Sequence, residues 1–401
     1  YKSFTETYTE DKMSDANREQ VSRYINGLWQ QMLTDVSNSR KISKDSLNHY
    51  ADGLMVFDDS KLLKSRKFVD GFCYYDEIRN IVKKQLGLKP DQKIAQVSMK
   101  DVNAAINDNY MMGDEIAVYY CQGSIVRMAT PSIYGDEQQI VSSDVVRDLE
   151  ELAEDKNVKA VVLRINSGGG DAYASEQIWH AVKELKTKKP VIVSMGDYAA
   201  SGGYYISCVA DTIVAEPTTL TGSIGIFGMI PNVKGLTDKI GLSYDVVKTN
   251  KYADFGNIMR PFNEDEKSLL QMMITEGYDT FVTRCAEGRH MTKEAIEKIA
   301  EGRVWTGETA KELGLVDELG GIDKALDIAV AKVGIEGYTV VSYPEKQDFL
   351  SSLLDTKPTN YVESQLLKSK LGEYYQQFGL LKNLQEQSMI QARIPFELNI
   401  K

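Results

Sequence analysis

The sequence predicts an α/β fold with a largely buried sheet, and three features of the chain support this prediction. Short apolar runs alternate with segments of helical periodicity between residues 116 and 216, as is typical of βαβ units. With 401 residues, of which 42% are apolar, the chain is long enough to bury more than one core. Segments of the two halves also resemble each other, which indicates an internal repeat.

The elements of this fold follow one another in a regular order. The apolar run at 116–126 predicts a strand, and the next segment has the apolar spacing of a helix near 143–154. The same alternation then predicts strand 158–167, helix 172–186, strand 190–195, a helix from about residue 199, and strand 212–216.

The repeat is recognised by two pairs of segments. "RKISKDSLNHYADG" at 40–53 matches "RHMTKEAIEKIAEG" at 289–302, and the stretch at 67–78 resembles that at 314–325. A helix with matched apolar spacing precedes each copy, and the second helix begins with the capping pair Asn263 and Glu266.

The repeat predicts how the domains are organised. Residues 116–345 form a complete second copy, whereas 1–88 match only the C-terminal part of a first copy. We expect a linker at 89–115 and a helical tail at 346–401, with its helix near 361–384.

Composition excludes several classes of function. The net charge is −11 and no basic cluster is present, so no nucleic-acid partner is expected. The four cysteines form no CxxC pair, and His49, His180 and His290 form no HExxH motif, so we expect no metal and no cofactor. No apolar run reaches the roughly 18–20 residues of a membrane span.

The glycine-rich stretch "RINSGGGDAYAS" at 164–175 leaves three interpretations open. It lacks the GxxxxGK[ST] pattern of a phosphate loop, and it fails GxGxxG because Tyr173 occupies the last position. Its glycines could expose backbone N–H groups as an oxyanion hole. It could also be a simple strand-to-helix turn.

A serine among small residues, Ser201 in "GDYAASGGYYIS" at 196–207, is the candidate nucleophile. It lies at the start of a predicted helix, where unpaired N–H groups favour an anion. Its small neighbours would let a substrate backbone approach. The alternative is structural, because serine also caps helices and Ala/Gly clusters mark close packing.

The chain carries three motifs in this order: "INSGGGD", "SMGDYAASGGYYIS" and "PTTLTGSIGIFG". Their order and wording closely resemble those of bacterial signal peptide peptidase A, also called protease IV. The opening segment "YKSFTETYTEDKMSDANREQVSRYINGLWQ" resembles the part of the long, two-repeat form that carries its lysine. The resemblance implies a crotonase/Clp-protease-like fold of repeated ββα units, with one complete copy after the C-terminal part of another.

The same resemblance implies a serine protease with a Ser-Lys dyad. It assigns Ser201 as the nucleophile, Lys2 as the general base and Ser223 as the residue that orients the lysine. The amine must be neutral to accept a proton, so its pKa of about 10.4 in water has to fall through desolvation. The oxyanion hole would comprise the N–H groups of Gly169 or Gly170 together with Gly202.

The repeat gives a further indication of which lysine is the base. Aligning 250–261 with the "YKS" segment places Ala253 opposite Lys2, so the second copy has lost the lysine and kept the serine. Lys251 is the rival if the alignment slips. One departure from the family concerns Gly168, which stands where proline is usual and makes the loop less preorganised.

The resulting hypothesis is a peptidase that degrades cleaved signal peptides and similar apolar segments, bound as an added strand. The family implies a homotetramer anchored to the bacterial inner membrane, with its catalytic part on the periplasmic side. The anchor would lie in an N-terminal segment absent here, since the chain begins at Tyr1 and we expect a fragment or processed form. The alternatives are a crotonase-type acyl-CoA enzyme and a catalytically silent scaffold.

Overall fold

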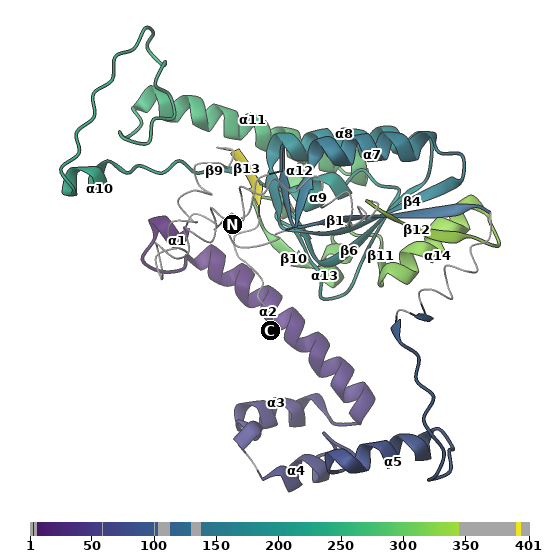
Figure 1. Cartoon of the computed structure of the whole chain (residues 1–401). Coiled ribbons are helices and arrows are strands. Elements are labelled where there is room, and N and C mark those ends of the chain that lie inside the picture. The colour runs from purple at the N-terminus through teal and green to yellow at the C-terminus, as the bar shows by residue number, and fades with distance from the viewer. Residues whose placement is uncertain are drawn as a thin grey trace. The chain divides into compact units, whose positions relative to one another are not determined.

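The computed structural model separates the chain into two compact units, one formed by residues 1–24 and 113–401 and the other by residues 25–112. Figure 1 shows the sheets of the first unit and the helices of the second. The residues that the structure describes are 3, 6–57, 59–99, 101–102, 113–129, 138–344 and 390–393.

The first unit is built on a main sheet of eight strands among the described residues. All of its strand pairs are parallel except the antiparallel β8–β10 pair. The strand order is β10 (Val304–Thr306), β8 (Leu220–Gly222), β6 (Val191–Ala200), β4 (Val158–Ser167), β1 (Glu115–Gln122) and β12 (Thr339–Tyr343), while β7 (Thr212–Ala215) pairs with β6 and with β11 (Glu318–Leu319).

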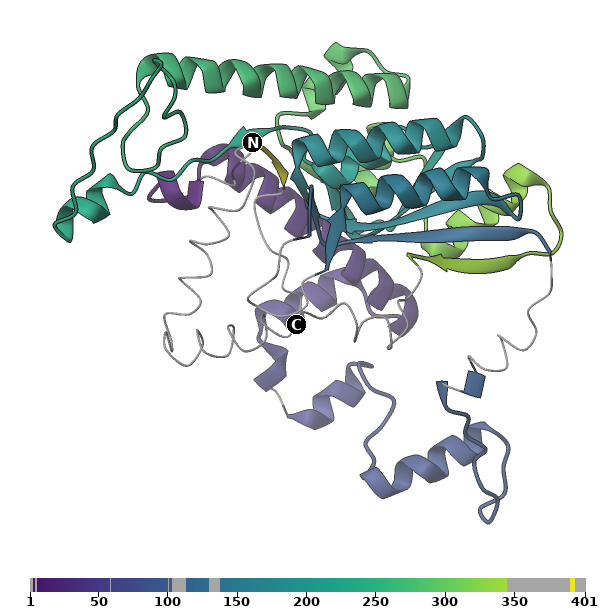
Figure 2. The ribbon, with the colours of Figure 1, turned by 45° about the horizontal axis from the view of Figure 1, so that its top comes forward.

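Successive side chains of β4 point to opposite faces of this sheet, and each face has its own buried core. Val161 and Leu163 belong to the cluster that includes residues of α7 (Ser142–Glu154) and α8 (Ala172–Lys186). Ala160 and Val162 belong to the cluster beneath α14 (Ile322–Val333). Both faces are thus covered by helices, as Figures 1 and 2 show, and the strands are apolar on both sides.

Most of the expected elements are confirmed. β4 and α8 have the predicted bounds, α7 begins one residue earlier than expected, and β7 ends one residue earlier. The run at 116–126 is not one strand but two, β1 and β2 (Ser124–Val126), separated by Gly123. Gly123 has φ +99°, and a Cβ there would lie 1.7 Å from the Gln138 carbonyl oxygen, so only glycine fits this corner.

A second sheet stands beside the C-terminal end of the main sheet's central strands and has five strands in the described part of the chain. Its order is β3 (Gln139–Val141), β2, β5 (Gly169–Asp171), β13 (Ile390–Arg393) and β9 (Phe227–Gly228). β5 is the glycine stretch itself, so the glycines form neither a phosphate loop nor a plain turn but a strand with neighbours on both sides.

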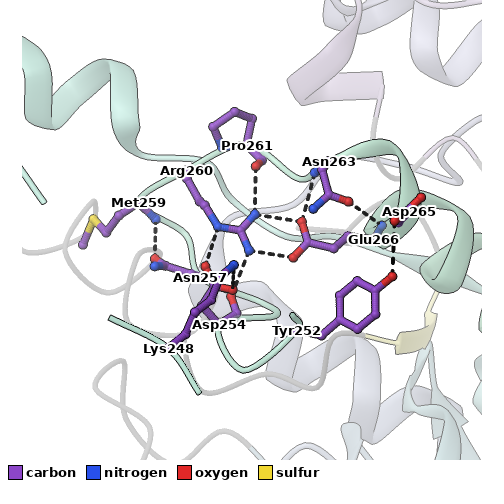
Figure 3. Close-up of polar contacts among 10 residues, drawn as sticks. All are labelled: Lys248, Tyr252, Asp254, Asn257, Met259, Arg260, Pro261, Asn263, Asp265 and Glu266. Atoms are coloured by element: carbon purple, nitrogen blue, oxygen red, sulfur yellow. Dashed lines mark hydrogen bonds and ion pairs between the residues drawn. The ribbon is translucent and has the colours of Figure 1, made fainter. Parts of the chain in front are cut away.

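The long helix α11 (Glu264–Arg289) begins with the expected capping box, in which Asn263 and Glu266 exchange side-chain-to-backbone hydrogen bonds. Arg260 lies in the preceding segment and donates to Glu266 at 2.6 and 2.7 Å and to Asp254 at 2.8 Å. Figure 3 shows its guanidinium between the two carboxylates. The segment before α11 is therefore fixed by charged side chains, with α10 (Lys234–Lys239) further upstream.

Several further helical elements belong to the first unit. α9 (Gly202–Ser207) follows β6, and α12 (Lys293–Ile299) and α13 (Gly307–Glu312) flank β10. α1 (Glu6–Thr9) and the first residues of α2 (Asp15–Arg40) also belong to it.

The second unit contains the remainder of α2 and a small cluster of helices. Leu33, Ile42 and Leu47 form its buried core. Its other elements are α3 (Lys44–Asp52), a 3-10 turn η2 (Met55–Phe57), α4 (Ser60–Ser65) and α5 (Tyr75–Gln85). The predicted helix at 361–384 lies outside the described residues, and none of the described helices is long and apolar enough to cross a membrane. The two-copy division of the chain stays a prediction.

Candidate functional site

Ser201 lies at the junction between strand β6 and helix α9, fully buried. Its backbone has φ 56° and ψ −116°, a conformation that non-glycine residues rarely adopt. The side chain makes no capping hydrogen bond, so the structural alternative of a helix cap is not what holds it here. A strained, buried serine on a sharp strand-to-helix turn is the arrangement by which folds present a nucleophilic hydroxyl.

Ser223 stands at the end of the neighbouring strand. The parallel register of β6 and β8 pairs Ala200 with Gly222, so the residues that follow them, Ser201 and Ser223, leave the sheet side by side. The Ser201 N–H donates to the Gly222 carbonyl at 2.8 Å, and the Ser223 N–H donates to the Arg303 carbonyl at 2.7 Å. Ser223 is also buried and also has a positive φ, of 50°.

The glycine strand β5 is held by a serine that sequence reasoning missed. The buried Ser167 hydroxyl donates to the Gly123 carbonyl at 2.7 Å and accepts the Gly169 N–H at 3.1 Å. It therefore ties the corner between β1 and β2 to the start of β5. Gly169 has φ +96°, which exposes its backbone as only glycine allows.

The small residues around Ser201 have a packing reason. A Cβ on Gly203 would lie 2.6 Å from the Ser167 carbonyl oxygen, and one on Gly202 would lie 2.7 Å from the Ser175 hydroxyl and 3.0 Å from the Gly169 Cα. Helix α9 thus begins against the glycine strand. Close packing, one of the two readings of the Ala/Gly cluster, brings Ser201 and β5 together.

The N-terminal segment is connected to the same site through described residues. Ser3 is buried and its hydroxyl accepts from the Gln20 side chain at 3.1 Å. One turn along α2, the Arg23 guanidinium lies 5.3 Å from the centre of the Trp305 ring. A Cβ on Gly222 would lie 2.8 Å from that same ring. Lys2 itself lies outside the described residues.

Two family models match this chain. The model of Peptidase family S49 matches residues 1–89 and 183–336, which include Lys2, Ser201 and Ser223. The chain belongs to peptidase family S49. The Clp protease model matches residues 113–218, the part that contains the glycine strand, and together with the parallel sheet it supports a Clp/crotonase-like fold.

Curated relatives agree with the S49 assignment. The chain is 38% identical to Protease 4 of Salmonella typhi over 89% of its own length and 58% of that protein. It is 32% identical to the chloroplastic serine protease SPPA of Arabidopsis thaliana, over 98% of this chain and 58% of the relative. Protease 4 of Haemophilus influenzae is also 32% identical, with 100% and 64% covered. The chain therefore spans about three fifths of the length of these relatives.

Among solved structures, a mutant of ClpP1 from Listeria monocytogenes overlaps 56% of this chain and 98% of its own, with 17% identity and a TM-score of 0.36.

Lys251, the rival base of this S49 chain, lies in a different environment from the one a neutral amine requires. Its ammonium forms an ion pair with Asp265, and its side chain is largely exposed. The hydrogen bond to Asp265 raises the pKa of Lys251 above its usual value. This lysine therefore stays protonated, which does not suit a general base.

The carboxylate nearest the glycines is used for structure. Asp171 accepts from the Ala174 N–H at 2.7 Å, which caps α8, and from Arg127 at 3.0 Å. Among the described residues no group of three or more His, Cys, Asp or Glu side chains could hold a metal ion. His290 is the left-handed residue that ends α11, while His49 and His180 lie on α3 and α8.

Sequence reasoning missed three contributors to the site: the Ser167 bridge, the Arg23–Trp305 contact, and β13. The first could have been suspected, since a serine directly before glycines often bonds to a nearby backbone. The other two join segments far apart in the chain, for which a single sequence holds no signal.

Proposed function

We propose that this chain carries the catalytic site of a serine endopeptidase in which Ser201 is the nucleophile and Lys2 the general base. The observation that carries the proposal is the buried, positive-φ Ser201 beside Ser223 and the glycine strand, within a chain of family S49. Contacts of the segment that includes Lys2 support its choice. The Gln20 side chain donates to the Ser3 hydroxyl, and Arg23, one turn further along α2, lies over the Trp305 ring. That ring packs against Gly222, the residue before Ser223.

The reaction would proceed by acyl transfer. The neutral Lys2 amine takes the Ser201 proton as the hydroxyl oxygen attacks a peptide carbonyl carbon, and it then returns the proton to the leaving amine. Ser223, on the neighbouring strand end, would hold the lysine in place. The N–H of Gly202, with that of Gly169 or Gly170, would stabilise the oxyanion, and such a donor is worth about 10²–10³ in rate.

The substrate would be an extended peptide, in keeping with the proteases among its relatives. β5 lies beside Ser201 and pairs with β2 on one side and with β13 on the other. A peptide backbone that took the place of β13 would pair with β5 while its alternate side chains entered pockets. We extend this to remnant signal peptides and similar apolar segments on the strength of the resemblance to signal peptide peptidase A.

The wider biology is proposed on the same basis. A homotetramer, anchored to the bacterial inner membrane by an N-terminal segment and facing the periplasm, is the arrangement that the resemblance implies. The relatives named Protease 4 support a bacterial peptidase of this kind. Measuring the mass of the native assembly and its distribution between membrane and soluble fractions would test both points.

The acyl-CoA alternative is less well supported. Such an enzyme would act through carboxylates, whereas this chain belongs to peptidase family S49 and places a buried serine, Ser201, beside the glycine strand. A silent scaffold would require Lys2 to stay protonated.

A fluorophosphonate probe tests the proposal directly. The wild-type chain should be labelled on Ser201 and should hydrolyse casein, whereas Ser201→Ala should do neither. The matched control is Ser207→Ala, a buried serine on α9 whose hydroxyl donates only to the Gly203 carbonyl within the helix. Equal labelling of the wild type and Ser201→Ala would refute the assignment.

A further inference from the structure

Two cysteines that the proposed reaction does not use lie in contact behind the nucleophile. Cys208 caps the C-terminus of α9, the helix that begins directly after Ser201, and Cys285 lies on α11. Both side chains are fully buried in the same core. The Cys208 thiol donates to the Tyr205 carbonyl at 3.1 Å, which leaves its sulfur as the acceptor of the hydrogen bond that it shares with the Cys285 thiol. The two sulfur atoms therefore meet between α9 and α11.

The two helices approach each other closely around this thiol pair. Residues three and four apart share one face of a helix, so Phe281, Cys285 and Gly288 face α9 together. The ring centres of Phe281 and Tyr205 are 4.5 Å apart, and a Cβ on Gly288 would lie 2.1 Å from the Cys208 carbonyl oxygen. A disulfide joins Cα atoms no more than about 6.8 Å apart, so it needs two backbones in such close contact.

Burial determines when these thiols can react. It raises the pKa of the Cys285 thiol well above its usual range. Because the thiolate is the reactive form, the folded chain protects the thiol pair from exchange. While the chain is folding, before α11 packs on α9, both thiols are exposed and can react with a disulfide in their surroundings. The structure thus favours a cross-link that forms during folding and is then shielded by the core.

We propose that Cys208 and Cys285 form a disulfide that holds the helix behind Ser201 on α11. The oxidant is a donor disulfide, either a small one such as oxidised glutathione or that of a thiol oxidoreductase. The thiolate of one cysteine attacks a donor sulfur and releases one donor thiolate. The thiolate of the other cysteine then attacks the cysteine sulfur of this mixed disulfide and releases the second. Two electrons and two protons pass from the cysteines to the donor, which leaves as two thiols.

This inference goes beyond the proposed peptidase activity and does not rest on it. It requires only that the chain folds where donor disulfides are present. The periplasmic side of the membrane, where the proposed function places the catalytic part, is such an oxidising compartment.

Apolar packing is the alternative role for the two cysteines. Buried cysteines can serve simply as small apolar side chains. Cys121 on β1 is a buried cysteine of the same core, and burial raises the pKa of its thiol to about 12. Packing needs only the volume of each side chain and does not require two sulfur atoms to meet. If packing is the whole role, Cys208 and Cys285 should stay reduced in the presence of a donor disulfide.

Counting thiols separates the two interpretations. The full chain is made by cell-free synthesis with either oxidised glutathione or dithiothreitol, in a Cys73→Ala background because the exposed Cys73 would itself take up glutathione. Each product is unfolded in guanidinium with N-ethylmaleimide and its mass is measured. Three cysteines remain in this background. The reduced product should gain three maleimides and the oxidised product one, and a peptide map should join Cys208 to Cys285.

Two variants in this background provide the controls. Cys208→Ala should gain two maleimides under both conditions, because Cys285 has lost its partner. Cys121→Ala should gain two when reduced and none when oxidised. Oxidation should raise the thermal unfolding midpoint by about 5–10 °C in the background chain and in Cys121→Ala, since the cross-link closes a long loop. It should not raise the midpoint of Cys208→Ala.

Several results would overturn the proposal. These are three maleimides on the oxidised background chain, a map that joins Cys121 to either thiol of the pair, or an equal loss of thiols in Cys208→Ala. A disulfide that leaves the unfolding midpoint unchanged would also overturn it, because the cross-link would not hold the native helices together. Fluorophosphonate labelling of Ser201 in the same samples tests the peptidase separately, so either conclusion can fail without the other.

Discussion

The backbone N–H of Ser201 donates to the carbonyl of Gly222 at 2.8 Å, across two parallel strands that are each followed by a serine of positive φ. This hydrogen bond fixes where β6 stops and where the chain turns into α9. Because Ser223 follows Gly222 directly, it also fixes the spacing of the two serines that we assign to the site.

The two candidate lysines should differ sharply when each is removed. Lys2→Ala should lower kcat by about 10²–10⁴-fold, the usual contribution of a general base. Lys251→Ala breaks only exposed contacts, the ion pair with Asp265 and the stacking of the ammonium on the Tyr252 ring, so kcat should not change. Hydrolysis of casein by both variants, with the thermal unfolding midpoint as the check on folding, measures this. A large loss of kcat in Lys251→Ala, with none in Lys2→Ala, would identify Lys251 as the general base.

Ser167→Ala should impair catalysis without removing any group that touches the substrate. It deprives the Gly123 carbonyl and the Gly169 N–H of their buried partner, which costs about 1–3 kcal/mol. We expect kcat to fall more than KM changes, because the oxyanion donors shift. Ser207→Ala, an equally buried serine, is the control. Similar kinetics of the two variants would show that the Ser167 bridge does not position the site.

Gly203→Ala tests the packing of α9 on the glycine strand. The added Cβ would lie 2.6 Å from the Ser167 carbonyl oxygen, and forcing it in should destabilise the chain by about 1–3 kcal/mol. The loss of labelling at Ser201 should accompany the fall in thermal stability. Gly71→Ala, which has nothing within 4 Å of its added Cβ, should alter stability by less than about 0.5 kcal/mol. A stable and active Gly203→Ala would contradict this account.

The segment before α11 should loosen in acid. Hydrogen bonds from Arg260 lower the pKa of the buried Glu266 from its ordinary value of 4.5 to about 2. Since the folded pKa lies below the unfolded one, the stabilisation is complete above about pH 4.5 and is lost as the pH falls towards 2. Hydrogen exchange of residues 248–266 across this range should show the opening.

Substitution of the buried carboxylate identifies the source of this pH dependence. Glu266→Gln should weaken the segment at neutral pH and flatten its response to acid between pH 4.5 and 2. Glu264→Gln removes an exposed carboxylate that pairs with Lys267 and should leave both unchanged. An identical acid response in the wild type and Glu266→Gln would assign the opening to other groups.

The helices and central strands were predictable because their buried residues recur in the sequence at the spacing of a helix or a strand. β4 and α8 have the expected bounds since each carries an uninterrupted apolar pattern. The end of β6 was missed. We predicted a strand that ends at residue 195 and a helix from about residue 199, yet β6 continues to Ala200 because Ala199 and Ala200 pair with Thr221 and Gly222 of β8. Pairing with a partner further along the chain leaves no trace in local composition.

Only part of the candidate site could be predicted from the sequence. Ser201 and the glycines stand in motifs, and the structure brings them together through the contact of Gly202 with Gly169. The strand at 390–393 has no such motif. Its place is set by backbone pairing with Gly169 and Gly170, which lie more than 200 residues earlier in the sequence.

The location of β13 has a kinetic consequence. A segment tethered to the protein that binds it competes at an effective concentration on the order of millimolar, whatever the dilution of the sample. Free peptides at micromolar levels would therefore wait for the tethered strand to depart. The inhibition of peptide turnover by this strand should therefore stay the same when the protein is diluted, since each molecule carries its own competitor.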